Sequence, residues 1–269
     1  MTSPQSVPVS VVVITKNEEP NIERCLKSAS WAAETVVVDA HSADGTRDKA
    51  AALGARVFER DWSGYGPQKN LGVSMARNPW ILNVDADEEV TPELAAEIQQ
   101  VLIDPQHKAY RVFIPTYFMG RPLKHYGRAW PEPGHIRLFE KGHARFDSRI
   151  VHEVVEVDGS VGSLKAPILH YSYPTAGTYW RKIHYYADLE AQERAARWNS
   201  LGNRWIRFAG KLGWMLGVRR GILHGPSAWL WILGQAYQDW LATGEAARLR
   251  RGMEKAPTLP SPRGGGWMG

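Results

Sequence analysis

Three clusters of polar residues each follow an apolar stretch in the first third of the chain. The clusters are Thr15-Lys16-Asn17-Glu18, Asp39-Ala40-His41-Ser42-Ala43-Asp44-Gly45-Thr46 and Asp85-Ala86-Asp87-Glu88. Each cluster alone is compatible with ordinary loop chemistry, because Asp and Asn cap helices and Asp-Gly is a common turn pair. On parallel strands all three would lie along one sheet edge, which is where open α/β sheets bind ligands. The combination therefore favours a ligand site.

The Asp85-x-Asp87 pair is the most informative of these features. A turn after an extended segment lets both carboxylates reach one cation, and hard oxygen ligands suit Mg²⁺ or Mn²⁺, which also bind phosphate oxygens. A bare pair of this kind is common in proteins, but here it directly follows the apolar stretch Ile81-Leu82-Asn83-Val84. The pattern predicts a divalent metal, Mn²⁺ or Mg²⁺, as cofactor.

The elements that must position these clusters alternate between strand and helix patterns. Strand patterns occupy residues 9–15, 35–39, 56–59 and 80–85. A first helix pattern begins at Pro20, and further helix patterns cover residues 46–53, 67–75 and 92–102. Stretches rich in β-branched residues, such as residues 9–15, are typical of strands buried on both faces. The alternation predicts an α/β fold with a mostly parallel sheet flanked by helices.

The remainder of the chain changes character twice. Short strand patterns at 109–118, 137–139 and 168–171 are broken by Pro and Gly, and helical patterns follow from Thr175. Residues 256–269 are rich in Pro and Gly without an apolar period, so we expect a disordered tail.

Composition limits the class of protein. With 269 residues, 43% of them apolar and 23% charged, the chain is an ordinary globular mixture rather than a disordered or collagen-like one. The single cysteine, Cys25, excludes an intrachain disulfide, and it shares a helical face with Ile22 and Leu26, which favours a core position over a catalytic thiol. No secretion signal and no stretch of about 18 apolar residues is found, so we expect a cytoplasmic protein without a spanning helix.

The quoted motifs resemble those of a known family. Val12-Val13-Ile14-Thr15-Lys16-Asn17-Glu18, Val37-Val38-Asp39 with Ser42-Ala43-Asp44-Gly45-Thr46, and Asp85-Ala86-Asp87-Glu88 resemble, in order and spacing, the family 2 nucleotide-sugar glycosyltransferases. Arg137-Leu138-Phe139 and Val151-His152-Glu153 are similar to the lipopolysaccharide core, β-glucosyltransferase-like subgroup. The resemblance implies a Rossmann-like GT-A fold, a nucleotide-sugar donor, a divalent metal and inversion at the anomeric carbon.

This resemblance also suggests a division of the chain. A GT-A catalytic domain is expected at 1–174, with a nucleotide-binding half at about 1–105 and an acceptor half at about 106–174. A helical extension that contacts membrane or acceptor is expected at 175–255, before the tail at 256–269.

On the donor side, the resemblance assigns roles residue by residue. Side chains expected to border the nucleoside pocket are Thr15, Asn17 and Glu18, with Asp39 bonded to the base, which would be uracil in a UDP-sugar. Gln68, Lys69 and Asn70 would face the donor, and Asp85 and Asp87 would set its sugar-diphosphate and the metal. Lys69 would screen the diphosphate or, equally, be a solvated surface lysine. His41 departs from the small-residue loop usual in the subgroup, and this departure is expected to alter the base or ribose contacts.

The acceptor side needs a general base that takes the proton of the attacking hydroxyl. Glu153 is the favoured candidate and Glu132, in Trp130-Pro131-Glu132-Pro133, is the alternative. His152 would complete the metal shell or be an ordinary hydrogen-bonded histidine. Arg137 would hold a phosphate or an acidic group of the acceptor, the alternative being an edge-strand arginine.

The helical part invites a membrane interpretation. Between Leu201 and Gln238 there is no acidic residue, and Trp205, Phe208, Leu212 and Met215 recur at helical spacing. The residues expected at an anionic membrane surface are Arg204, Trp205, Arg207, Phe208 and Lys211. The alternative is that the stripe packs on the catalytic domain.

The function favoured by these features is transfer of a hexose from a nucleotide sugar to a lipid-anchored glycan such as lipopolysaccharide core, on the inner face of the cytoplasmic membrane. A rival acceptor is a polyprenyl phosphate or a capsule or exopolysaccharide intermediate. A nucleotidyltransferase would usually show a Gly-rich basic loop after the first strand, where this chain has Lys16-Asn17-Glu18-Glu19. A non-enzymatic adaptor would leave the three polar clusters unexplained, and no nucleic-acid partner is expected.

Overall fold

The computed structural model describes residues 7–122, 134–147, 154–197, 203–218 and 221–255. Within them, a seven-stranded sheet has the order β12-β6-β9-β4-β1-β2-β3. Its strands are β1 (Val7–Thr15), β2 (Ala32–Asp39), β3 (Arg56–Glu59), β4 (Trp80–Asn83), β6 (Ala109–Val112), β9 (His135–Glu140) and β12 (Val161–Ser163). Strand β9 runs antiparallel to its neighbours β4 and β6, and the other pairings are parallel. The expected α/β fold with a mostly parallel sheet is confirmed.

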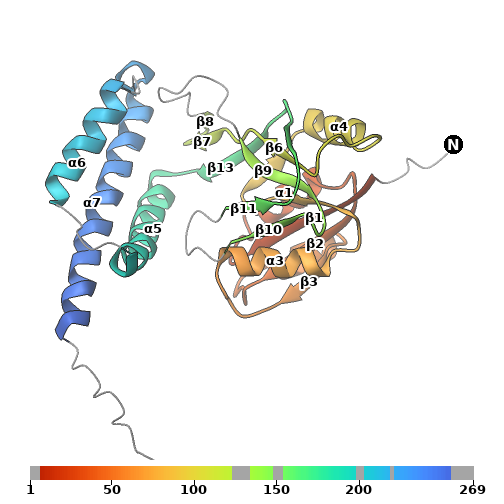
Figure 1. Ribbon diagram of the computed structural model, residues 1–269, viewed down its shortest axis with the longest axis horizontal. Helices are drawn as coiled ribbons and strands as arrows, with labels where there is room; N and C mark the ends of the chain where they lie inside the picture. The colour runs from red at the N-terminus through yellow and green to blue at the C-terminus, as the bar shows by residue number, and fades with distance from the viewer. Residues whose placement is uncertain (1–6, 123–133, 148–153, 198–202, 219–220, 256–269) are drawn as a thin grey trace, which may run out of the picture.

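Two apolar layers bury the two faces of this sheet, as the uniform β-branched runs require. On β1, Val11 and Val13 face the layer that contains α1 (Ile22–Ser28), α2 (Thr46–Ala52) and α4 (Pro92–Val101). The intervening Val12 and Ile14 face the layer of α3 (Tyr65–Met75). Figure 1 shows α3 and α4 flanking the sheet. Cys25 is fully buried in the first layer, as its helical spacing indicated.

Smaller sheets complete the central part of the chain. A four-stranded sheet has the order β5-β13-β7-β8, formed by β5 (Glu88–Val90), β13 (Ile168–Tyr173), β7 (Thr116–Phe118) and β8 (Arg121–Pro122). Strands β10 (Ala144–Phe146) and β11 (Val155–Val157) form a separate pair.

The single strand expected at 109–118 is wrong, because the structure has two strands there, β6 and β7, in different sheets. The break coincides with Pro115, which has no N–H to continue the ladder. The carbonyls of Phe113 and Pro115 instead accept hydrogen bonds from Ile168 and His170 of β13. The chain thereby crosses from the large sheet to the smaller one.

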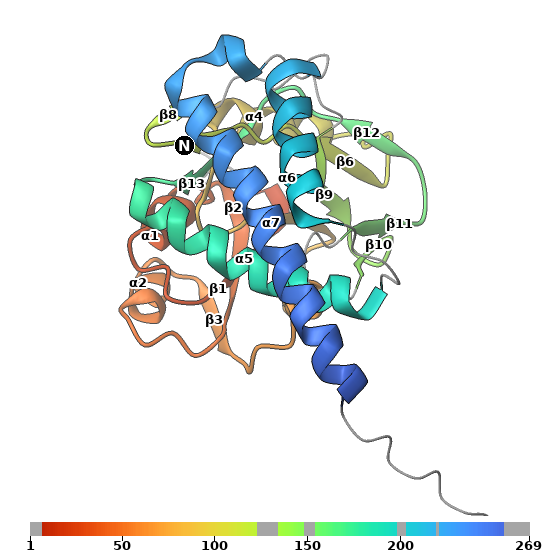
Figure 2. The ribbon, with the colours of Figure 1, turned by 90° about the vertical axis from the view of Figure 1, so that its left-hand side faces the viewer.

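The helices that follow β13 form a group beside the sheets (Figures 1 and 2). The group consists of α5 (Ala176–Arg197), α6 (Arg204–Gly213), the short helices η1 (Trp214–Val218) and η2 (Gly221–His224), and the long α7 (Pro226–Lys255). Helix α7 packs on both α5 and α6. In the described part of the chain, no helix is both long and apolar enough to cross a membrane. The helical extension is present, whereas the domain boundaries at 105 and 174 stay predictions.

Candidate functional site

The carboxyl ends of β1, β2 and β4 meet at one edge of the large sheet, as the sequence predicts. Thr15 is paired in register with Asp39, and Val12 with Asn83, so the polar residues that follow these strands are neighbours. The third cluster continues directly from β4 into β5. This edge is the candidate functional site.

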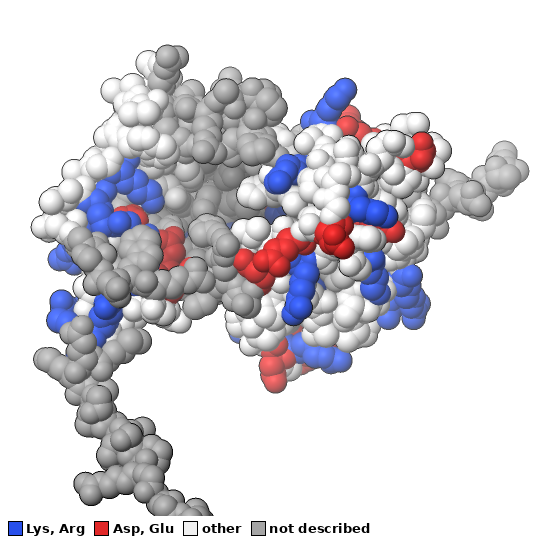
Figure 3. Space-filling view, viewed as in Figure 1, with Lys and Arg blue, Asp and Glu red and all other residues white. Residues whose placement is uncertain are grey.

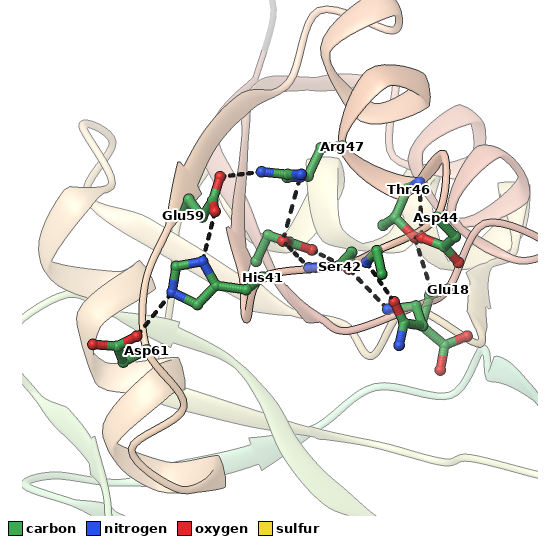
Figure 4. A network of polar contacts seen from close by, with 11 residues as sticks. Glu18, His41, Ser42, Asp44, Thr46, Arg47, Glu59 and Asp61 are labelled. Atoms are coloured by element: carbon green, nitrogen blue, oxygen red, sulfur yellow. Dashed lines mark hydrogen bonds and ion pairs between the residues drawn. The ribbon is translucent and has the colours of Figure 1, made fainter.

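The first two clusters interlock through hydrogen bonds (Figure 4). The Asn17 backbone N–H donates to Ser42 Oγ (2.8 Å), and the Asn17 side-chain oxygen accepts from the Ala43 N–H (2.8 Å). The Glu18 N–H donates to Thr46 Oγ1 (2.9 Å). Asn17 has φ of +55°, a left-handed conformation that asparagine tolerates better than most residues. These bonds fix the two loops against each other.

Asp39 lies beneath this pair of loops and is fully buried. Its carboxylate accepts from the backbone N–H (2.8 Å) and the hydroxyl of Ser42. Beside it, Thr15 is buried, and its hydroxyl has no hydrogen-bond partner among the described residues. An unpartnered buried hydroxyl is uncommon and is typical of a position completed by a ligand or water.

His41 also has a positive φ (+56°), and Figure 4 shows its ring directed toward Glu59 and Asp61. Its Nδ1 lies 2.5 Å from Glu59 Oε1 and its Nε2 lies 2.8 Å from Asp61 Oδ1. The hydrogen bond to Glu59, followed by that to Asp61, raises the pKa of His41 above its usual value. The residue that departs from the resembled loop is therefore held outward by two carboxylates.

Asp85 is held by two cations that come from different elements. Its Oδ1 lies 2.9 Å from Lys69 Nζ on α3, and its Oδ2 lies 3.0 Å from the guanidinium of Arg137 on β9. Burial alone would raise the pKa of Asp85, but Arg137 and Lys69 outweigh it and hold the pKa well below its ordinary value. Lys69 is buried, so it is not a solvated surface lysine.

Arg137 connects three acceptors and is itself buried. Besides Asp85, it donates to Asn83 Oδ1 (3.0 Å) and to Glu88 Oε1 (2.7 Å). Glu88 is fully buried and also accepts from the Asp85 N–H (2.8 Å). Burial and the neighbouring Asp85 raise the pKa of Glu88 to about 7, against the opposing effect of Arg137. Strand β9 lies inside the sheet, which excludes the edge-strand alternative for Arg137.

Asp87 faces a second pair of basic groups. Its Oδ1 lies 3.2 Å from His170 Nε2 on β13, and its Oδ2 lies 2.8 Å from Lys182 Nζ on α5. Burial would raise the pKa of Asp87, but His170 and Lys182 lower it far below its ordinary value. Burial lowers the pKa of His170, and Asp87 more than offsets that effect, so the net shift is upward.

Asp87 and His170 are the described residues whose side chains would suit a divalent cation at this edge. The described residues contain no group of three His, Cys, Asp or Glu arranged around one point, so protein side chains alone do not form a cage there. Mg²⁺ and Mn²⁺ are commonly bound through one or two carboxylates together with substrate phosphates and water. A carboxylate and an imidazole in contact supply the protein part of such a set.

The other predicted donor residues lie on α3. Gln68 is fully buried, its Oε1 accepts from Ser63 Oγ (3.3 Å), and its amide nitrogen has no partner among the described residues. Asn70 donates to the Phe146 carbonyl (2.8 Å) and accepts from the Phe146 N–H (3.0 Å). Its side chain therefore fastens α3 to β10, and the donor contact expected of it stays a prediction. Glu18 is half-buried, and burial raises its pKa.

Three of the predicted site residues, Glu132, His152 and Glu153, lie outside the described residues. Their roles stay predictions. Conversely, sequence reasoning missed His170 and Lys182, and it gave Glu88 no role. No local signal marks them, because His170 and Lys182 lie 83 and 95 residues from Asp87 along the chain.

The residues predicted to contact a membrane are divided between two environments. Arg207 donates to both Asp239 oxygens on α7 (3.2 and 2.9 Å), and the Arg204 guanidinium lies 4.1 Å from the centre of the Trp240 ring. Lys211 has its pKa lowered by burial. Trp205 is 60% exposed and Phe208 is half-buried.

The stripe is not one exposed face. Leu212 and Met215 pack against Ile232 of α7, so they lie within the helical extension and not on the catalytic domain, whereas Trp205 is exposed. The helical spacing of these residues in the sequence could not show which of them are buried by packing and which are exposed.

Comparison with known proteins decides the family. The model of the family described as "Glycosyl transferase family 2" matches residues 10–155, which include the two interlocked loops, Asp85, Asp87 and Arg137. The chain belongs to glycosyl transferase family 2. It is 30% identical over 205 residues to the lipopolysaccharide core biosynthesis glycosyltransferase LpsC of Rhizobium meliloti, covering 70% of this chain and 72% of that protein.

Other relatives extend the match. An uncharacterized glycosyltransferase of Rickettsia typhi is 31% identical over 217 residues, covering 77% of this glycosyltransferase and 74% of the relative. Among solved structures, S. aureus TarS 1–349 in complex with UDP-GlcNAc shares the fold, with a TM-score of 0.50 and 13% identity over 92% of this chain and 91% of that one. The fold of the family 2 glycosyltransferase is therefore GT-A.

Proposed function

We propose that this family 2 glycosyltransferase transfers a hexose from a UDP-sugar to a lipid-anchored glycan such as lipopolysaccharide core, with inversion at the anomeric carbon. The observation that carries the proposal is the cluster at the sheet edge, where Asp85 and Asp87 are held by basic groups from α3, β9, β13 and α5. The relative named as a lipopolysaccharide core biosynthesis glycosyltransferase supports the acceptor class.

The described residues would divide the work of donor binding. Asp39 and the loops that cover it would take the nucleoside, with Thr15 offering a hydroxyl and Gln68 an amide nitrogen that lack partners among the described residues. Asp87 and His170 would hold the divalent cation, which when bound supplies positive charge to the departing diphosphate. Lys69 and Arg137 hold Asp85 in one position, so it needs no rearrangement when the donor binds.

The acceptor hydroxyl must lose its proton as it attacks the anomeric carbon. Glu153 remains our first choice for the general base and Glu132 the second. A general base contributes roughly 10²–10⁴-fold to the rate, so Glu153→Gln should lower turnover by that factor and leave UDP binding intact. If Glu132→Gln has this effect and Glu153→Gln does not, the two roles are reversed.

The test of the function is a donor screen. The protein is incubated with UDP-, GDP- and TDP-sugars and Mn²⁺, and release of the nucleotide is followed with and without EDTA. We expect release from a UDP-sugar that stops in EDTA and in Asp87→Asn. Asp104→Asn, which changes an exposed carboxylate beyond α4, is the matched control. Release from none of the donors, or undiminished release by Asp87→Asn, would contradict the proposal.

The acceptor is tested separately with isolated lipopolysaccharide core and with polyprenyl phosphate. Transfer to the core is the expected result. Transfer to polyprenyl phosphate alone would retain the enzyme class and replace the acceptor.

A lipid-anchored acceptor requires the enzyme to reach a membrane surface, and we propose the apolar tip of the helical extension for this contact. We define the tip as Trp214 and Val218 of η1, Ile222 and Leu223 of η2, and Trp229 of α7, which are 45–75% exposed. The Trp229 indole N–H donates to the Ile222 carbonyl (3.0 Å), so η2 and α7 are joined there. Figure 3 shows uncharged atoms at the upper end of the helical part. Large exposed apolar side chains gathered on neighbouring short elements are typical of an interaction site.

Vesicle flotation tests the tip. Leu223→Ser should weaken binding to vesicles that contain anionic lipid by about tenfold, because the full burial of one leucine side chain is worth about 1.5–3 kcal/mol. Ile103→Ser is the matched control, since Ile103 at the far end of α4 is exposed to the same extent, 75%. Equal binding by Leu223→Ser and Ile103→Ser, or no flotation of the wild type at low salt, would contradict the proposed membrane contact of the tip.

A further inference from the structure

Lys182 is a residue of the helical extension that reaches into the candidate donor site. It lies near the start of α5, which follows β13 directly, and its ammonium is 2.8 Å from Asp87 Oδ2. The ammonium also lies 5.7 Å from the centre of the Tyr173 ring. Its side chain keeps 29% of its surface exposed, against 12% for Asp87. The contact is therefore open to solvent on the side of the lysine.

The charges around the two aspartates are already balanced by the protein. Asp85 has Lys69 and Arg137, and the two oxygens of Asp87 have His170 and Lys182. Arg137 and His170 lie on the strands β9 and β13, and Lys69 lies on α3, which packs against the large sheet. Lys182 sits at the end of a flexible four-carbon chain, which gives its ammonium a freedom that a buried guanidinium lacks.

A divalent cation bound at Asp87 and His170 would add positive charge beside the Lys182 ammonium, which lies 2.8 Å from Asp87 Oδ2. Two positive charges in contact with one carboxylate repel each other strongly where protein replaces part of the surrounding water. The ammonium must then move, and the nearest new negative charge would be the diphosphate of the donor. Lys and phosphate oxygens form charge-assisted hydrogen bonds that are about twice as strong as neutral ones.

We propose that Lys182 is a donor-binding residue that moves from Asp87 to the diphosphate of the nucleotide sugar when the cation and donor bind. This inference rests on the proposed function, because it requires a diphosphate donor. In the absence of donor, Lys182 neutralises Asp87. In its presence, the same side chain ties α5, and with it the helical extension, to the bound nucleotide.

The proposal predicts that one substitution raises the affinity for Mn²⁺ and lowers the affinity for UDP. Lys182→Gln should bind Mn²⁺ about tenfold more tightly in the absence of nucleotide, because a competing positive charge is gone; this corresponds to about 1.4 kcal/mol. It should bind UDP at saturating Mn²⁺ about tenfold more weakly, because one charge-assisted bond is lost. Lys182→Arg should stay near the wild type in both measurements.

Mn²⁺ binding is measured by electron paramagnetic resonance of the free ion, and UDP binding by calorimetry. Arg181→Gln is the matched control, since it removes one positive charge from the neighbouring, exposed position on α5. A lysine that merely docks α5 would lower the thermal unfolding temperature and leave both affinities unchanged or reduce both. Either pattern would overturn the proposal.

A second measurement needs no variant. Amine acetylation of the wild type, read by mass spectrometry, should label Lys182 faster with Mn²⁺ than without it, and slowest with Mn²⁺ and UDP together. A labelling rate that does not respond to Mn²⁺ and UDP would also overturn the proposal. If the wild type binds no nucleoside diphosphate, the proposed function itself fails. If the wild type and Lys182→Gln bind UDP with equal affinity, only this inference fails.

Discussion

Replacing Arg137 by methionine is expected to destabilise the protein strongly, although the substitution keeps much of the side-chain volume. Arg137 is only 9% exposed and donates to Asn83, Asp85 and Glu88. Asp85 would keep Lys69 as a partner, but fully buried Glu88 would lose the one basic side chain with which it forms an ion pair among the described residues. The main cost is therefore an uncompensated carboxylate at Glu88.

The size of the effect follows from this geometry. Removing one member of a buried ion pair costs about 3–5 kcal/mol, because the remaining charge is left without compensation. That is a large part of the roughly 5–15 kcal/mol by which a typical domain is stable. Adding Glu88→Gln to Arg137→Met removes the stranded charge, so the double variant should recover at least about 1 kcal/mol.

Urea unfolding at pH 8, followed by tryptophan fluorescence, measures these differences. Arg145→Met on β10 is the control, because Arg145 is exposed and its loss should change the free energy of unfolding by less than about 0.5 kcal/mol. A loss below about 1 kcal/mol in Arg137→Met would refute the reasoning, and so would a double variant no more stable than the single one.

Two further predictions concern titration. Because the pKa of Glu88 is raised to about 7, the folded protein binds more protons than the unfolded chain, so this group contributes stability at low pH that is lost between about pH 4.5 and 7. Urea unfolding at several pH values should show a steeper decline in the wild type than in Glu88→Gln, and parallel curves would contradict the assignment. For His41, an NMR titration should give a pKa above 6.5, and Glu59→Gln should lower it more than Asp61→Asn does. Because the pKa of His41 is raised in the folded protein, this group contributes stability below pH 6.5, and the contribution is lost as the pH rises through the pKa of the folded state. A His41 titration midpoint at 6.5 would show that the Glu59 contact does not persist in solution.

The sequence was most informative where structure is determined locally. Residues 56–59 were predicted as a strand with the bounds that β3 has, because Val57 and Phe58 are typical strand residues and both flanking positions are charged. The helix pattern expected from residue 92 matches the start of α4, where the Thr91 hydroxyl caps the helix by accepting from the Leu94 N–H at 3.2 Å. The sheet edge that gathers Thr15, Asp39 and Asp85 followed from parallel alternation alone.

The contacts of Asp87 could not be predicted in the same way. His170 reaches it because β13 pairs antiparallel with β5 in a register that sets His170 opposite Glu88. Nothing in residues 168–173 specifies that partner, since the register depends on how two distant segments pack. The contact between Lys182 and Asp87 depends in turn on where α5 starts after β13. Arg137 was predicted to hold a phosphate or an acidic group of the acceptor, which stays a prediction, and its bonds to Asp85 and Glu88 could not be foreseen because they require β9 to lie beside β4.

The position of β9 has a consequence for the order in which the chain can fold as it is synthesised. Strands β1 to β4 are contiguous in sequence, but β4 meets its outer neighbour only when residues 135–140 exist. At about 5–20 residues per second, the ribosome needs roughly 3–11 s to make the 57 residues from Asn83 to Glu140. During that interval β4 presents an unpaired edge that carries Ile81 and Leu82, both fully buried once the protein is complete. A nascent chain halted before residue 135 should therefore be a substrate for chaperones, and a fragment that ends at residue 105 should aggregate.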